Sequence, residues 1–163
     1  MAREYVISAG GITVANQAVT LVFINPASPG ASIEILRCWV SQSANATSAQ
    51  QRVQLVTQAT AFPTLTSATP AKTKINDPAS GIAGGTAGAA GTCGINASAE
   101  GGGTKTVILN DAFNALNGWL WVPTPRETII LNALTAQGFG LHLPVAPATL
   151  TNWSFGVVFQ EIG

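Results

Sequence analysis

Few side chains in this sequence could perform chemistry. It contains one histidine, His142, and seven carboxylates spread from Glu4 to Glu161. His142 alternates with leucines in Gly-Leu-His-Leu-Pro, and no Gly-x-Ser-x-Gly nucleophile elbow accompanies it, so a Ser-His-Asp triad is not indicated. One histidine without a Cys-x-x-Cys pair does not supply a zinc site. We therefore predict that His142 is a structural residue, either hydrogen-bonded or facing solvent.

The carboxylates and the glycines give no catalytic pattern either. Glycosidases need two carboxylates across one cleft, and none of these lies in a cluster of polar and aromatic residues. The run from Gly101 to Thr106 is similar to a phosphate-binding loop, but Thr104 separates the last glycine from Lys105, and a strand pattern follows instead of a helix. We expect a flexible loop that enters a strand, and predict neither an enzyme nor a cofactor or metal.

Charge is scarce throughout the chain. Charged residues make up 9% of the sequence and the formal net charge is zero, whereas a typical soluble domain is about 25% charged. Residues 5–33 and 128–160 carry no charge at all. Little electrostatic repulsion keeps copies of such a chain apart, and its scattered Lys and Arg give no footprint for nucleic acid. We expect a surface that other protein covers.

The apolar runs are too short for a membrane-spanning helix. The longest are about four residues, such as Leu21 to Ile24, whereas a span needs about 20. The start, Met-Ala-Arg-Glu-Tyr, lacks the basic and then apolar pattern of a secretory signal, so we expect synthesis in a cytoplasm. Cys38 and Cys93 are predicted to be unpaired thiols in that reducing compartment, with a bridge between them as the alternative.

Strand patterns dominate the sequence. Runs of β-branched and aromatic residues bounded by Gly, Pro, Asn and Ser predict strands at 4–9, 12–15, 18–25, 31–42, 52–58, 104–109, 118–122, 127–135, 139–145 and 153–162. In the 31–42 strand, positions 33, 35 and 37 are expected on one face and 34, 36 and 38 on the other. The whole chain, residues 1–163, is predicted to be one all-β domain, an antiparallel β-sandwich of the jelly-roll type.

Four segments are expected to depart from this pattern. Residues 1–10 are a possible N-terminal arm. Residues 81–103 contain nine glycines and are predicted to form a long, flexible, peripheral loop, because glycine backbone is costly to order and few side chains are available to bury. Residues 110–116 are a candidate for one helical turn, and Gln137-Gly138 for a hairpin turn.

Aromatic residues and close charge pairs are the interface candidates. Trp119 and Trp121 share one face of a strand, and either pack in the core or form a patch at a subunit contact. A sugar-stacking role would need polar neighbours, which Leu120 and Val122 do not supply. Three close charge pairs are candidates for ion pairs between subunits, with solvated surface pairs as the alternative: Arg3 with Glu4, Glu34 with Arg37, and Arg126 with Glu127.

The end of the chain carries a resemblance. The run Trp153-Ser-Phe155-Gly156-Val-Val-Phe159 is similar to the closing strand of the trimeric tumour-necrosis-factor and C1q jelly rolls, in which such a run lines the three-fold axis. This adds Trp153, Phe155 and Phe159 to the interface candidates.

In size, charge poverty and Ala/Gly/Thr/Ser richness, the whole chain resembles the small jelly-roll decoration (cement) proteins of tailed bacteriophage capsids. That resemblance implies a non-catalytic homotrimer on the outside of the virion, bound to the major capsid protein through the 1–10 arm and the 81–103 loop. The alternatives are another virion component, such as a coat protein, fibre head or spike, and a carbohydrate-binding module.

Overall fold

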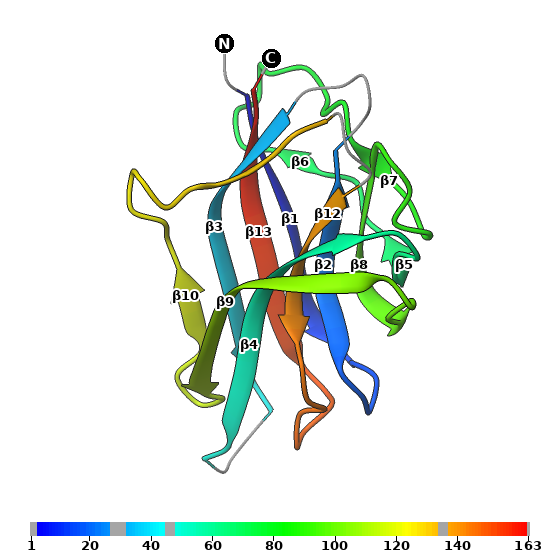
Figure 1. Cartoon of the computed structure of the whole chain (residues 1–163). Helices are drawn as coiled ribbons and strands as arrows, with labels where there is room; N and C mark the ends of the chain where they lie inside the picture. The colour runs from blue at the N-terminus through cyan, green and yellow to red at the C-terminus, as the bar shows by residue number, and fades with distance from the viewer. Residues whose placement is uncertain (1–2, 27–31, 45–47, 134–136, 163) are drawn as a thin grey trace.

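Two antiparallel sheets packed face to face enclose one apolar core (Figure 1). The computed structural model describes residues 3–26, 32–44, 48–133 and 137–162, and within these ranges the regular structure consists of strands without a helix. The predicted all-β sandwich is confirmed.

Sheet A has the strand order β10-β3-β13-β1-β6, and β11 also pairs with β3. Its central strand, β13, lies between β3 and β1 and pairs with each along nearly its whole length. The strands of sheet A are β1 (Arg3–Ile12), β3 (Ser32–Gln42), β6 (Ala71–Lys72), β10 (Trp119–Trp121), β11 (Ile129–Leu131) and β13 (Trp153–Ile162).

Sheet B has the order β5-β8-β2-β12-β4-β9, with the short β7 parallel to β8. Its strands are β2 (Val19–Asn25), β4 (Gln50–Ala59), β5 (Thr64–Ser67), β7 (Ala83–Gly84), β8 (Thr92–Ala99), β9 (Thr104–Asn114) and β12 (Gln137–Leu143). In this sheet β9 pairs with β4 and forms one edge.

The long-range pairing is nested. The first strand, β1, pairs with the last, β13; β2 pairs with β12; β3 pairs with β10 and β11; and β4 pairs with β9. The segment β5–β8 is inserted between β4 and β9; its strands β5, β7 and β8 extend sheet B beyond β2, and β6 pairs with β1 in sheet A. Each sheet therefore depends on contacts between residues far apart in the chain.

The inserted segment also covers the outer face of sheet B. All seven residues of β2 are buried, so this strand is shielded on both faces. The ring of Phe62 packs on Phe23, with 5.6 Å between the ring centroids, and the Asn25 side-chain amide donates a hydrogen bond of 2.8 Å to the Gly88 carbonyl. On this side the sandwich gains a partial third layer.

A β-bulge changes the predicted faces of β3. Arg37 pairs with Val158 and Ile35 with Phe159, which leaves Leu36 as the extra residue. Beyond the bulge the buried positions switch, so Cys38 is buried and Arg37 is exposed. The prediction that position 37 shares a face with 33 and 35 is wrong for this reason.

Three other predicted segments also differ in the structure. Residues 3–12 are not an arm but the strand β1, paired with β13 and β6. Residues 110–114 continue β9 instead of forming a helical turn. Gln137-Gly138 lies within β12 and not in a hairpin turn, because β11 and β12 belong to different sheets.

The glycine-rich segment 81–103 is a packed part of the fold and not a flexible loop. It contains β7 and β8, and Cys93, Gly94 and Ile95 are buried. The glycines permit close backbone approach: a Cβ on Gly94 would lie 2.7 Å from the Gly85 carbonyl oxygen, and one on Gly103 only 1.8 Å from that of Thr60. The glycine-rich composition predicted a mobile loop, because composition alone does not show that these glycines lie where two backbone segments pack closely together.

Replacement of Gly94 by alanine tests this packing. The added methyl would lie within 2.8 Å of the Leu65 Cβ and the Thr66 carbonyl oxygen, and overpacking of this kind costs about 1–3 kcal/mol. We expect chemical denaturation to show a loss of that size for Gly94→Ala. Gly102→Ala is the control, because nothing lies within 4 Å of its Cβ position. Equal stability of the two variants would contradict the packed assignment.

Candidate functional site

Three of the aromatic interface candidates lie inside the core. Trp153, Phe155 and Phe159 of β13 are at most 1% exposed. The Trp153 indole donates a 2.8 Å hydrogen bond to the Thr149 carbonyl and meets the Phe113 ring edge-on. These side chains pack between the two sheets and are covered by their own chain.

The other two candidates lie at an edge of the sandwich. Trp119 and Trp121 are half-buried in β10, the edge strand of sheet A. The Trp119 indole donates a 2.9 Å hydrogen bond to Asp111 of β9, which links the edges of the two sheets. Leu120 between them points outward and is 63% exposed.

Exposed apolar side chains gather at this edge. Among the described residues, nine large apolar side chains are exposed, and six of them lie on β9, β10, β11 and their connections. We call these six the apolar edge: Val107, Ile108, Leu116, Leu120, Val122 and Ile130. A concentration of exposed apolar side chains at one edge is a mark of contact surfaces.

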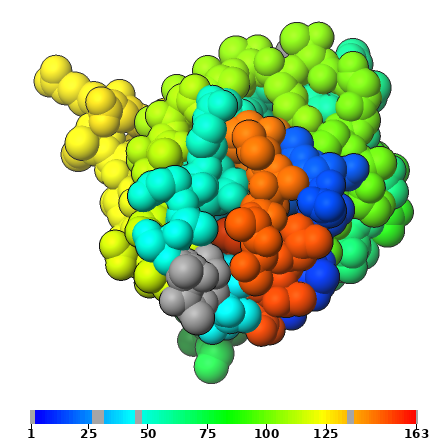
Figure 2. All heavy atoms as spheres, turned by 90° about the horizontal axis from the view of Figure 1, so that it is seen from below, coloured from blue at the N-terminus to red at the C-terminus, as the bar shows by residue number. Residues whose placement is uncertain are grey.

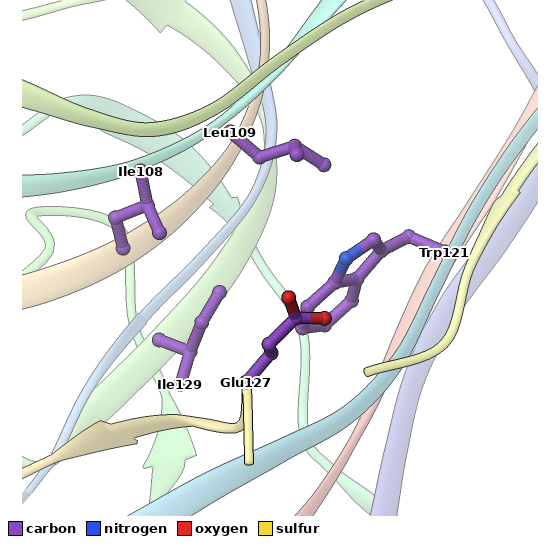
Figure 3. Close-up of a pocket in the computed structure, with 5 residues that line it drawn as sticks. All are labelled: Ile108, Leu109, Trp121, Glu127 and Ile129. Atoms are coloured by element: carbon purple, nitrogen blue, oxygen red, sulfur yellow. The ribbon is translucent and has the colours of Figure 1, made fainter. Parts of the chain in front are cut away.

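A groove opens between the two sheets at the same edge (Figure 3). It has a volume of about 240 Å³ and is lined by Ile108, Leu109, Trp121, Glu127 and Ile129. The Glu127 carboxylate lies beside the Trp121 ring in Figure 3, and the other lining side chains are aliphatic. The apolar character of the groove suits contact with another apolar surface.

The predicted charge pairs do not form within the chain. In the described part of the molecule the ion pair is Lys105–Glu100, at 2.6 Å, and the His142 imidazole lies 3.4 Å from the same carboxylate. Glu34 instead accepts a hydrogen bond from Gln160, and the Arg37 guanidinium lies over the Trp39 ring, 5.3 Å from its centroid. Arg3, Arg126 and Glu127 are exposed, and Glu4 is half-buried.

A buried polar cluster surrounds the single histidine. Glu100 accepts hydrogen bonds from the Thr20 amide and hydroxyl, at 2.5 and 2.7 Å, and pairs with Lys105. The His142 Nδ1 lies 3.3 Å from the Thr20 hydroxyl and 3.4 Å from the Glu100 carboxylate. The prediction of a hydrogen-bonded His142 holds, and the ring is 5% exposed.

The geometry of this cluster is not that of a nucleophile with its base. In a catalytic triad the acid and the hydroxyl contact different nitrogens of the imidazole, whereas here Thr20 and Glu100 both approach Nδ1. The cluster ties β2 and β12 to the start of β9, so its contribution is structural. Sequence spacing does not reveal it, because Thr20, Glu100 and His142 are far apart in the chain.

Burial shifts the titration of His142. Desolvation lowers its pKa from 6.5 to about 4; the Glu100 carboxylate opposes this shift and the Lys105 ammonium adds to it. The folded protein therefore keeps His142 neutral, while the unfolded chain binds a proton near pH 6.5. Above pH 6.5 the histidine is neutral in both states, and its contribution to the free energy of unfolding is fully present. As the pH falls from 6.5 toward 4, only the unfolded chain gains the proton, so the free energy of unfolding decreases.

We predict a histidine-dependent loss of stability in acid. Between pH 7.5 and 4, the unfolding free energy of the natural chain should fall by up to about 3 kcal/mol more than that of His142→Gln, because about 1.4 kcal/mol accompanies each unit of the pKa shift. Urea denaturation across this range measures both proteins. The glutamine variant is the control because it keeps a polar side chain that does not titrate. Parallel curves would show that His142 is not kept neutral by burial.

Sequence reasoning missed two features of the outer face of sheet A. Trp39 covers Gly156: a Cβ on that glycine would lie 2.2 Å from the Trp39 ring. The pairing of Gly156 with Trp39 across β13 and β3 explains this contact, and the aromatic-glycine run at the end of the chain was its signal. The second feature is a shallow groove of about 250 Å³, lined by residues that include Trp39, Ser41, Asn117 and Trp119.

Comparison with known proteins finds no similarity to report: no family model, no curated protein and no solved structure matches this chain. Within the described ranges, no helix is long and apolar enough to cross a membrane. The same ranges contain no group of three or more His, Cys, Asp and Glu side chains placed to hold a metal ion. The described thiols of Cys38 and Cys93 are buried and unpaired, as predicted.

Proposed function

We propose that this chain is a non-catalytic structural protein of a virion: a capsid decoration (cement) protein that trimerises and binds the major capsid protein at the shell surface. The observation that carries the proposal is the apolar edge: six exposed aliphatic side chains lie on β9, β10, β11 and their connections, and one of them, Ile108, also lines the groove between the sheets. A zero net charge adds no repulsion between copies.

We also propose that the sandwich is a jelly roll. The nested pairing of β1 with β13, β2 with β12, β3 with β10 and β11, and β4 with β9 supports this. Jelly rolls occur in viral capsids and in lectins, so the fold fits a virion role without specifying it. The functional proposal therefore depends on the exposed apolar edge and not on the fold.

The proposed mechanism is mechanical. Each subunit would add contact area across a joint in the shell, and linkage of three subunits would raise the effective concentration of each weak contact. Because residues 3–12 form an inner strand of sheet A, and residues 81–103 are packed into the fold, neither of the segments predicted to contact the capsid is a free arm. The capsid contact would come from surface that trimerisation leaves exposed.

Solution mass tests self-association. We expect light scattering to give the mass of three chains for the natural protein, with little change between low and high salt, because the contact is apolar. Ile130→Asp should reduce the trimer at a fixed protein concentration by about tenfold, the effect of about 1.4 kcal/mol. Ile75→Asp is the matched control, since Ile75 is 93% exposed and lies away from the apolar edge. A monomeric natural protein would contradict the proposal.

Capsid binding needs a separate test. Co-sedimentation with shells of the major capsid protein encoded by the same virus should retain the natural protein and lose Ile130→Asp, because trimerisation multiplies the weak capsid contacts. Trimers that do not sediment with such shells would leave a self-associating virion component of another kind, such as a fibre head or spike.

Carbohydrate binding is a second candidate, favoured by one observation. The residues that line the shallow groove on sheet A include two tryptophans, Trp39 and Trp119, and two polar residues, Ser41 and Asn117. Sequence reasoning found no such polar neighbours beside Trp119 and Trp121. Titration of tryptophan fluorescence with cellohexaose, chitohexaose and laminarihexaose tests it. A flat response to all three would remove this candidate.

A further inference from the structure

A projecting loop, residues 122–128, leaves the body of the molecule between β10 and β11. We call it the arm. Seen from below, the yellow segment that contains it extends away from the rest of the chain (Figure 2). Val122 is 60% exposed, and Thr124, Pro125, Arg126 and Glu127 are exposed as well. Most side chains of the arm are therefore exposed to solvent and are not packed against the rest of the chain.

The tip of the arm is nevertheless preorganised. The Glu127 amide donates a 2.9 Å hydrogen bond to the Thr124 carbonyl, which closes a turn with Pro125 in its second position. The Thr124 hydroxyl donates a second hydrogen bond, also 2.9 Å, to the Glu127 carboxylate. Proline fixes the backbone where the turn requires it. A projecting segment with a fixed shape loses little entropy when it binds.

The turn presents one cation without a partner. Within the described residues, Arg126 makes no ion pair, whereas the carboxylate beside it, Glu127, is held by Thr124. A planar guanidinium of this kind suits a carboxylate on another surface. The arm therefore carries an anchor for an acidic site outside its own chain.

Two of the carboxylates that remain for this anchor, Glu4 and Glu34, lie on the outer face of sheet A. The third, Asp77, lies between β6 and β7 and has one side-chain oxygen buried, so it is less accessible to the anchor. Most of the others already have strong partners: Glu100 pairs with Lys105, Asp111 with the Trp119 indole, and Glu161 with Ser80 and Gly81. Glu4 and Glu34 both pair in register with Gln160 of β13, from opposite sides, so all three lie in one row across the sheet. Glu4 has no side-chain partner in the described structure, and Glu34 has the neutral Gln160.

Apolar groups continue from this acidic row on the same face. The next row joins Val6, Val158 and the exposed Arg37, which pair in register, and the extra residue of the bulge, Leu36, is half-buried beside them. The Arg37 guanidinium lies over the Trp39 ring, 5.3 Å from its centroid, and is one of the charges at the border of the apolar groups. Trp39 lies flat on Gly156 in the following row. This face has the composition of a contact surface, an apolar centre bordered by a few charges.

We propose that the arm of one copy docks on the outer face of sheet A of a second copy, with Arg126 on the acidic row of Glu4 and Glu34 and with Val122 and Pro123 on the apolar rows. The occupant is a second copy because the two surfaces are complementary in charge and each lacks a partner within its own chain. The contact joins unlike patches and is therefore heterologous, and the proposed trimer requires that three such contacts close into a ring. This deepens the proposed function, on which it rests, by assigning the self-contact.

Charge reversal tests the docking, with solution mass and the dissociation constant from light scattering as readouts. Arg126→Glu should weaken association about tenfold or more, because it places a third carboxylate on the acidic row. Adding Glu34→Arg or Glu4→Arg to that variant should restore association to within about threefold of the natural chain. Arg52→Glu is the matched control: Arg52 is an exposed cation on β4 of sheet B, outside both the arm and sheet A, and the same change of charge there should leave association unchanged.

The outcomes separate this inference from the proposed function. A monomeric natural protein overturns both. A natural oligomer whose affinity Arg126→Glu leaves unchanged overturns the docking of the arm while self-association stands. Weakening by Arg126→Glu that neither second reversal relieves overturns the assignment to the acidic row.

Discussion

The structure depends on keeping water out of the core between two sheets whose strands pair over long sequence distances. The inner faces contribute large buried side chains, among them Trp153, Tyr5, Phe139 and Phe159. One side of the sandwich is covered by the chain itself, because β5, β7 and β8 extend sheet B and the neighbouring loops cover β2. The opposite side, at β9, β10 and β11, has no such cover, and the exposed aliphatic residues lie there.

Scarcity of charge concentrates the polar interactions at a few positions. Glu100 contacts Thr20 of β2, Lys105 of β9 and His142 of β12, and these contacts connect the three strands. Glu161, 7% exposed, plays the same part at the other end by binding Ser80 and Gly81. Both of these carboxylates have hydrogen-bond donors, as burial of a charge requires. Arg126 and Glu4 have no side-chain partner in the described structure.

The sequence predicts the class of fold well, because strand periodicity and turn residues are local signals. It fails where the outcome depends on tertiary contacts. The bulge at Leu36 moves Cys38 to the buried face, and no pattern in 31–42 reveals it. The glycines of 81–103 are read as mobile, although at Gly94 and Gly103 they allow backbones to pack closely. The presence of a tryptophan does not predict whether its side chain is buried: Trp153 is buried in the core, whereas Trp119 and Trp121 are half-buried at the edge.

Hydrogen exchange at two protein concentrations is the most direct test of whether the uncovered edge is an interface. If copies associate through this edge, backbone amides of β9, β10 and the arm should exchange more slowly at high concentration, while those of β8, covered within one chain, should not change. Exchange at β9, β10 and the arm that is independent of concentration, in a sample shown to be oligomeric, would place the contact elsewhere and contradict the assignment of the apolar edge.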